Sequence, residues 1–172
     1  MKKLVFLAIS LFLLLSSNTF AEYPHYLDFK YVLNESEAGK KAQEQLKQKL
    51  DKGISSINIK EKEIREEEKK IIQQKKIISP EEYKKKVSDL RKKVSLLQKD
   101  RTKLINSVAD ERAKARIELL KNLNPIVKEF MIEKKVRMVL DKKELILADE
   151  TLDITIEITN RLNKKIKTIK IN

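Results

Sequence analysis

The chain has 172 residues, of which 39 are basic and 26 acidic, and it contains one histidine and no cysteine. A formal net charge of +13 favours encounter with acidic proteins, anionic lipids or nucleic acid and does not choose among them. The composition excludes disulfides and thiol catalysis. Because no glycine-rich phosphate loop or cluster of metal ligands occurs, we expect no enzyme activity, metal or cofactor, with His25 a solvent-exposed bystander.

Residues 1–21 have the three zones of a secretory signal peptide. Two lysines follow Met1, the segment from Leu4 to Leu15 is apolar, and small and polar residues lead to Ala21. The apolar zone is too short to span a bilayer comfortably, so we expect cleavage after Ala21 and export across a membrane. The alternative is a retained N-terminal anchor.

A strand and a long helical region are expected next. The segment from Tyr26 to Leu33 is rich in aromatic and branched residues and predicts a strand. Residues 36–123 contain only Gly39, Gly53 and Pro80 as helix breakers and have the composition of long helices. Two columns recur there every seven residues. One is apolar and the other is mostly charged: Leu50, Ile57, Ile64, Ile71 and Ile78, against Lys47, Ile54, Glu61, Glu68 and Lys75.

Pro80 divides this region into two arms of equal length, 36–78 and 81–123. Ser79 suits a helix N-cap, Pro80 the first helical position, and Glu82 the third position of a capping box. The sequence therefore predicts an antiparallel helical hairpin with its tip at 79–80, each arm roughly 64 Å long. Paired positions should sum to about 159, counting from the tip. This register sets Gly53 beside Asn106, where weak helix formers predict a bending point.

The remaining residues, 22–35 and 124–172, predict a small β-rich body. Pro125 should interrupt or bend the helical run before residues 126–134. The segments 136–140 and 144–148 flank a turn and predict a β-hairpin. Residues 152–162 alternate like a strand, but they also fit a helix capped by Asp153. A body of this size covers its own apolar surface poorly, so we expect an oligomer.

Two stretches resemble the Skp/OmpH family of periplasmic chaperones. Near the start, Val32, Leu33, Ser36, Gly39, Lys40, Ala42 and Leu46 match the segment that enters the first long helix of that family. Near the end, Asp141, Asp153, Ile154 and Thr155 match the closing strand-turn-strand, acidic loop and helix. The tail at 164–172 extends beyond the usual family ending.

The resemblance implies an α+β fold in which helical coiled-coil arms project from a body that trimerises into a β-barrel. It also favours helix over strand for 152–162. Its implied function is ATP-independent holding of unfolded outer-membrane proteins in the periplasm, with anionic lipid or lipopolysaccharide as a further candidate partner. The basic residues proposed to bind lipopolysaccharide in some members are not carried over to this chain.

Client contacts are expected along the arm. Four isoleucines lie off the regular seam, and two basic runs follow the tip: Ile54, Ile59, Ile72 and Ile77; Lys84, Lys85 and Lys86; Arg91, Lys92 and Lys93. The alternatives are that the isoleucines pack against the second helix and that the basic runs form a solvated face. Two other functions stay open, a structural coiled-coil spacer of the envelope and a basic, nonspecific nucleic-acid binder. We expect no specific nucleic-acid partner.

Overall fold

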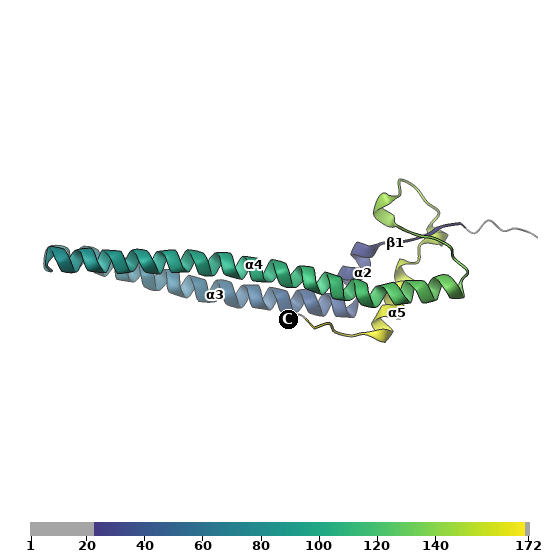
Figure 1. Ribbon diagram of the computed structural model, residues 1–172, viewed down its shortest axis with the longest axis horizontal. Coiled ribbons are helices and arrows are strands. Elements are labelled where there is room, and N and C mark those ends of the chain that lie inside the picture. The colour runs from purple at the N-terminus through teal and green to yellow at the C-terminus, as the bar shows by residue number, and fades with distance from the viewer. Residues whose placement is uncertain (1–22, 171–172) are drawn as a thin grey trace, which may run out of the picture.

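Two long antiparallel helices dominate the computed structural model, which describes residues 23–170 (Figure 1). Helix α3 spans Glu37–Gln74 and helix α4 spans Pro80–Glu133, which is 54 residues. The two helices run side by side as an arm, and the remaining elements gather at one end of it. The predicted helical hairpin is therefore confirmed. The fold as a whole is mostly helical and contains one small sheet, as expected.

The tip follows the capping chemistry expected from the sequence. Ser79 Oγ accepts a hydrogen bond from the backbone N–H of Glu82 at 3.2 Å, and Pro80 opens α4. The carboxylate of Glu82 pairs with Lys86 at 3.3 Å. Helix α3 ends at Gln74, four residues before the predicted end, because residues 75–78 form the turn.

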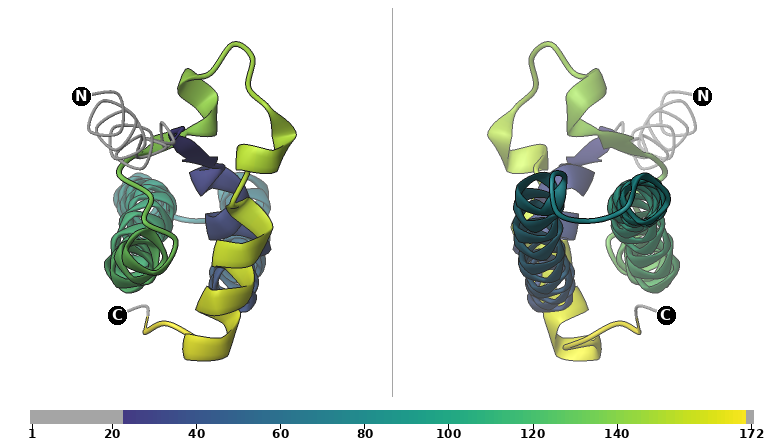
Figure 2. Two further views of the ribbon diagram at one scale, coloured as in Figure 1. Left: turned by 90° about the vertical axis from the view of Figure 1, so that its right-hand side faces the viewer. Right: turned by 90° about the vertical axis from the view of Figure 1, so that its left-hand side faces the viewer.

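The body combines a two-stranded sheet with short helices. Strand β1 (His25–Leu27) pairs in parallel with β2 (Val139–Asp141), and α2 (Phe29–Glu35) and α5 (Thr155–Lys165) complete the layer around the end of α4. The buried side chains form one apolar cluster: Leu27, Val32, Ala38, Leu119, Leu123, Ile126, Phe130, Val136, Ile154, Ile158 and Leu162. Helix α4 thus belongs to both the arm and the body (Figures 1 and 2).

The predicted strand from Tyr26 to Leu33 is wrong beyond Leu27. Asp28 Oδ1 accepts the backbone N–H of Tyr31 at 2.8 Å and caps helix α2. Val32 is fully buried while its neighbour Tyr31 is 40% exposed. An N-cap bond and one buried helical face outweigh the β-propensity of this segment.

The predicted β-hairpin is also wrong. Asp141 accepts the backbone N–H of Lys143 at 3.2 Å, and a single 3₁₀ turn, η1 (Lys142–Glu144), follows β2. Strand β2 pairs with β1 and not with residues 144–148. Ile146 and Leu147 project into solvent with relative exposures of 105% and 91%. The alternation of apolar and polar residues in 136–148 therefore indicated extended chain but did not indicate that β1 is the strand with which β2 pairs.

Pro125 does not interrupt α4, which continues to Glu133. Ile126 and Phe130 are each 2% exposed and lie in the same core as Leu123. Their burial offsets the hydrogen bond that a proline cannot donate.

Residues 155–165 are helical, which resolves the ambiguity of the 152–162 segment. Ile154, Ile158 and Leu162 recur every four residues and are all buried. Asp153 Oδ1 accepts the backbone N–H of Thr155 at 2.9 Å. Helical spacing of the buried residues thus decides between the two patterns.

The expected signal peptide, residues 1–21, lies outside the described residues. Within residues 23–170, no helix combines the length and the apolar character needed to cross a bilayer.

Candidate binding surface on the arm

The seam between α3 and α4 is one apolar column wide. Ile57 and Ile71 on α3 are 8% and 5% exposed, and Leu97 and Val108 on α4 are 6% and 7% exposed. The apolar column that begins at Leu50 does line this seam. The charged column predicted to accompany it, from Lys47 to Lys75, lies beside the seam and is exposed except for the half-buried Glu61.

One border of the seam, which we call the Arg101 edge, carries an ion pair between Arg101 and Glu61. The pKa of Glu61 lies below its usual value because it accepts a hydrogen bond from Arg65 and lies close to Arg101. The carboxylate therefore stays charged well below neutral pH.

The other border, the Asp100 edge, is joined by several polar pairs between the two helices. Lys60 pairs with Asp100 at 2.6 Å, a bond that lowers the pKa of Asp100. The other pairs are Lys93 with Glu67 at 2.5 Å, Lys86 with Gln74 at 2.8 Å, and Lys49 with Glu111. The residue numbers of these pairs sum to about 160, so the predicted register is correct. Exposed pairs like these contribute little stability each and weaken in salt.

The four predicted isoleucines are all exposed, so the alternative that they pack into the seam is wrong. Ile54 and Ile72 have exposures of 44% and 60%, and Ile59 and Ile77 have 60% and 82%. Ile54 and Ile72 are eighteen residues apart on α3, which is five full helical turns. Ile54 and Ile72 lie seven residues before and eleven after Glu61, on the Arg101 edge. Ile59 lies about 140° further around α3 and does not share that surface, and Ile77 lies beyond the end of α3, in the turn at the tip.

Two exposed apolar residues on α4 join Ile54 and Ile72, and the sequence interpretation missed both. Val94 and Ile105, at 43% and 62% exposure, lie seven residues before and four after Arg101. Their spacing from Arg101 identifies both residues as part of this edge, but the edge itself is recognised only once the ion pairs between the two helices are known.

The predicted basic residues differ in their engagement. Lys86 and Lys93 bond across to α3, and Lys92 pairs with Asp89 at 3.1 Å on its own helix. Lys84, Lys85 and Arg91 are exposed and have no ion-pair partner among residues 23–170. Of the six predicted basic residues, these three are free to meet an external anion without breaking an ion pair seen within residues 23–170.

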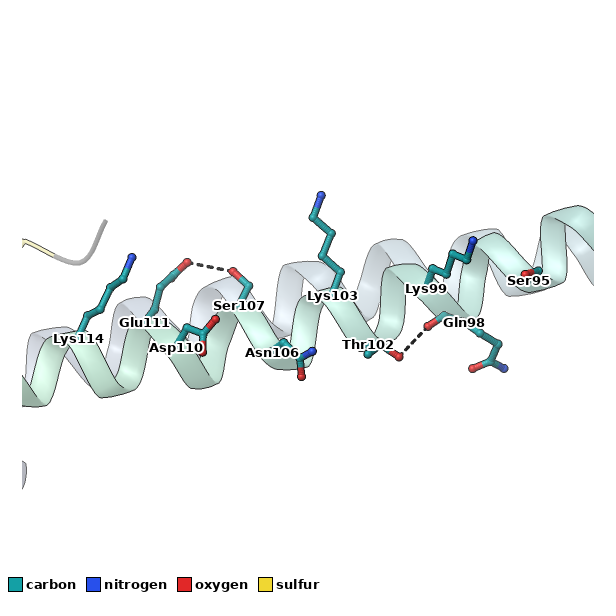
Figure 3. Close-up of a pocket in the computed structure, with 10 residues that line it drawn as sticks. All are labelled: Ser95, Gln98, Lys99, Thr102, Lys103, Asn106, Ser107, Asp110, Glu111 and Lys114. Carbon is teal, nitrogen blue, oxygen red and sulfur yellow. Dashed lines mark hydrogen bonds between the residues drawn. The ribbon is translucent and has the colours of Figure 1, made fainter.

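A shallow polar groove of about 760 Å³ follows α4 (Figure 3). Its lining side chains are polar or charged and are partly bonded to one another. Ser107 donates to Glu111 at 3.1 Å, and Thr102 donates to the backbone oxygen of Gln98 at 3.1 Å. These bonds are typical of a solvated helix face.

No group of three or more metal-binding side chains occurs in the part of the chain that is described. The expectation of an exposed His25 is wrong, because the ring is half-buried and packs edge-on against Phe130 at 6.1 Å between centroids. Its Nδ1 lies 3.2 Å from the backbone oxygen of Tyr23.

Comparisons with known proteins agree on one family. The model of the OmpH-like outer membrane protein family matches residues 25–162. A crystal structure from Caulobacter crescentus, described as that of a candidate OmpH-like outer membrane chaperone, superposes with a TM-score of 0.81. The two chains are 20% identical, and the match covers 87% of this chain and 90% of the other. No curated protein sequence matches significantly.

Proposed function

This chain belongs to the OmpH-like family of outer membrane proteins, and this membership supports a role as a chaperone. We propose that it is an ATP-independent periplasmic holdase. In this role it holds unfolded outer-membrane proteins and prevents their aggregation during transit. The proposal includes secretion through residues 1–21 with cleavage after Ala21.

The observation that carries this proposal is the exposed apolar residues of the Arg101 edge. Ile54, Ile72, Val94 and Ile105 are 43–62% exposed on a stable helical scaffold. They are separated by charged groups, among them the Glu61 and Arg101 pair. Dispersed apolar contacts give modest affinity at each point and allow release without an energy source.

The basic charge of the chain supports capture of the client. The free cations Lys84, Lys85 and Arg91 lie within about three helical turns of the tip. Charge of one sign accelerates encounter, and salt weakens the acceleration. Capture of an acidic client should therefore slow as salt rises, while holding by apolar contacts persists.

A homotrimer accounts best for the apolar surface left on the body. Ile146 and Leu147 are fully exposed, and Ile132 and Met138 are 80% and 55% exposed. Burying a large aliphatic side chain contributes about 1.5–3 kcal/mol, so association through this surface is favourable. Residues 144–148 have no strand partner among residues 23–170 and are the segment we expect to pair between copies. The number three comes from the resemblance.

The test is protection of an unfolded outer-membrane β-barrel protein that is diluted from urea without ATP. Light scattering should stay low with the wild-type protein. The variant Ile54→Gln/Ile72→Gln/Ile105→Gln should need about fivefold to tenfold more protein for equal protection, because three weak apolar contacts are removed.

A control replaces three other exposed isoleucines away from the Arg101 edge, as Ile59→Gln/Ile77→Gln/Ile117→Gln. This variant should protect like the wild type. Equal loss in both triple variants would show that position on the arm does not matter and would remove the Arg101 edge from the proposal. Full protection by both would contradict apolar holding by the arm.

The two other functions predict different outcomes. An envelope spacer would copurify with fixed partners at constant ratio and would not protect the client. A nucleic-acid binder would lose DNA affinity steeply with salt and would also leave the client unprotected. Mass in solution, measured in the same preparation, tests the trimer.

A further inference from the structure

A half-open groove of about 890 Å³ lies where the arm meets the body. Its walls come from α2, α3, α4 and the turn after β2. The floor is apolar and consists mainly of Phe29, Leu33, Ala42, Leu46, Ala115 and Leu119. Ala42, Leu46, Ala115 and Leu119 are buried, so the floor is part of the folded structure and not a set of mobile surface residues.

Backbone contact fixes the shape of this floor. A Cβ at Gly39 would lie 2.0 Å from the backbone oxygen of Leu33, so only glycine lets α2 approach α3 this closely. Ser36 Oγ accepts the backbone N–H of Gly39 at 3.2 Å and joins the two helices. The groove is therefore preorganised, which lowers the entropy that a ligand must lose there.

The rim of the groove is basic. Five cationic side chains and two carboxylates line it: Lys30, Arg112, Arg116, Lys142 and Lys143, with Asp28 and Asp141. Lys142 pairs with Asp153 at 3.0 Å, and Lys143 pairs with Asp141 at 3.5 Å.

The three other cations of the rim, Lys30, Arg112 and Arg116, are exposed. None of them has an ion-pair partner within residues 23–170. The groove thus offers unpaired positive charge beside an apolar floor. This pairing of surfaces matches a ligand that presents a carboxylate next to apolar side chains.

The groove also continues the proposed client surface. Arg112 follows Arg101 by eleven residues on α4, which returns it to the Arg101 edge. Ile54 is eight residues, or roughly 12 Å, beyond Leu46 along α3. A polypeptide lying on the edge can therefore enter the groove without leaving the surface of the arm.

We propose that this groove is a discrete binding site for a polypeptide segment that carries a carboxylate beside apolar side chains, such as a free chain terminus. The proposal rests on the proposed holdase function and deepens it. The Arg101 edge binds apolar residues of the client with little selectivity, whereas the groove selects one kind of client segment. Arg112 and Arg116 bind the carboxylate, and the floor binds the neighbouring side chains.

The test uses fluorescence anisotropy with a dansyl-labelled pentapeptide of alternating leucine and phenylalanine, made with a free carboxyl terminus or with a terminal amide. The full mature protein should bind the free acid about fivefold to tenfold more tightly than the amide, because a charge-assisted bond to arginine is lost in the amide. The variant Arg112→Gln/Arg116→Gln should bind both peptides equally.

The matched control, Lys99→Gln/Lys103→Gln, removes two exposed cations from the same helix, away from both the groove and the Arg101 edge, and should keep the preference for the acid. Equal binding of acid and amide by the wild type, or loss of the preference in the control, would overturn the proposal. Phosphatidylglycerol vesicles form a second arm. If they bind through Arg112 and Arg116 while the peptides show no preference, the ligand is a lipid and the peptide site is refuted.

Client protection by the same variants separates this inference from the function on which it rests. If Arg112→Gln/Arg116→Gln protects the urea-diluted client and the wild type shows no acid preference, the groove proposal fails and the holdase stands. If the wild type protects no client, the holdase itself fails.

Discussion

Helix α4 passes through two regions that are built differently. Between Leu119 and Phe130 it supplies four core residues that are at most 3% exposed, and they contact apolar side chains from β1, α2 and α5. Between Tyr83 and Val108 it meets only α3, and its apolar contacts form one narrow column bordered by ion pairs.

This difference teaches that one continuous helix can be rigidly packed at one end and weakly closed at the other. In the body, apolar burial from several elements specifies a single arrangement. In the arm, polar pairs that water can replace hold much of the contact, and large apolar residues stay outside the seam. A holding surface needs such unburied residues, and the body supplies the base that keeps them in place.

The largest expected effect comes from one substitution made in each region, Leu123→Ala in the body and Leu97→Ala in the arm. Leu123 is fully buried among residues of several elements, so its truncation should cost about 4 kcal/mol of unfolding free energy. Leu97 is 6% exposed with water-accessible borders on both sides, so its truncation should cost about 2 kcal/mol. Urea unfolding at one fixed protein concentration measures both, and equal losses would contradict the comparison.

The next effect compares the two glycines. Gly39→Ala sets a Cβ against the backbone oxygen of Leu33, which cannot move away, and should cost about 3 kcal/mol. Gly53→Ala sets a Cβ 2.5 Å from the Leu104 methyl groups, which can turn aside. Alanine also favours the helix by about 1 kcal/mol, so Gly53→Ala should be close to neutral. Thermal unfolding of both variants checks this, and a larger loss at Gly53 would reverse the ranking.

The arm was more predictable from sequence than the body. Its register and tip depend on local signals, the heptad column and the Ser79-Pro80 cap, which the sequence states directly. The body depends on contacts between distant segments. The pairing of β1 with β2 joins residues more than one hundred positions apart, and no local pattern in residues 136–148 names that partner. Likewise, Pro125 is tolerated because of core burial that a local rule ignores.

The candidate surface was half predictable. Ile54 and Ile72 were found because they lie off the apolar column. The same criterion also selected Ile59, which lies on another side of α3, and Ile77, which lies in the turn at the tip. Separating the two pairs requires the cross-helix bonds, since the seam is narrower than a two-column heptad predicts. The groove at the arm root was not predictable, because four separate segments form it.

A third and smaller effect concerns pH. Burial raises the pKa of Asp153, but hydrogen bonds from Thr155 and Lys142 outweigh it and hold the pKa below the usual value. Its contribution is therefore complete above the unfolded pKa of about 4 and is lost as pH falls through the lower folded pKa. Asp153→Asn should cost about 1 kcal/mol at pH 7, and the difference from wild type should shrink below about pH 4.

The matched arm variant is Glu61→Gln, whose carboxylate pairs with exposed cations. At pH 7, salt should reduce the loss of unfolding free energy caused by Glu61→Gln. The loss caused by Asp153→Asn should persist in salt, because Asp153 accepts a hydrogen bond from a backbone N–H as well as from Lys142. Unfolding at two salt concentrations separates them. If salt also reduced the loss of unfolding free energy in Asp153→Asn, the body and the arm would not differ in how their carboxylates are stabilised.

The smallest effect on stability, and the sharpest on motion, concerns the bending point near Gly53. Ser55 and Ser56 are exposed helix residues, and replacing both with alanine should stabilise α3 by less than about 1 kcal/mol. Gly53 is left unchanged, because a Cβ there would disturb Leu104 and confuse packing with bending.

In the cysteine-free chain, spin labels at Lys76→Cys near the tip and Arg137→Cys on the body report the distribution of arm directions. We expect the distribution to narrow in Ser55→Ala/Ser56→Ala and to stay broad in a control at Ser88→Ala, which is exposed and far from Gly53. An unchanged distribution in both variants would show that the weakness of the arm lies in its polar edges and not in one hinge.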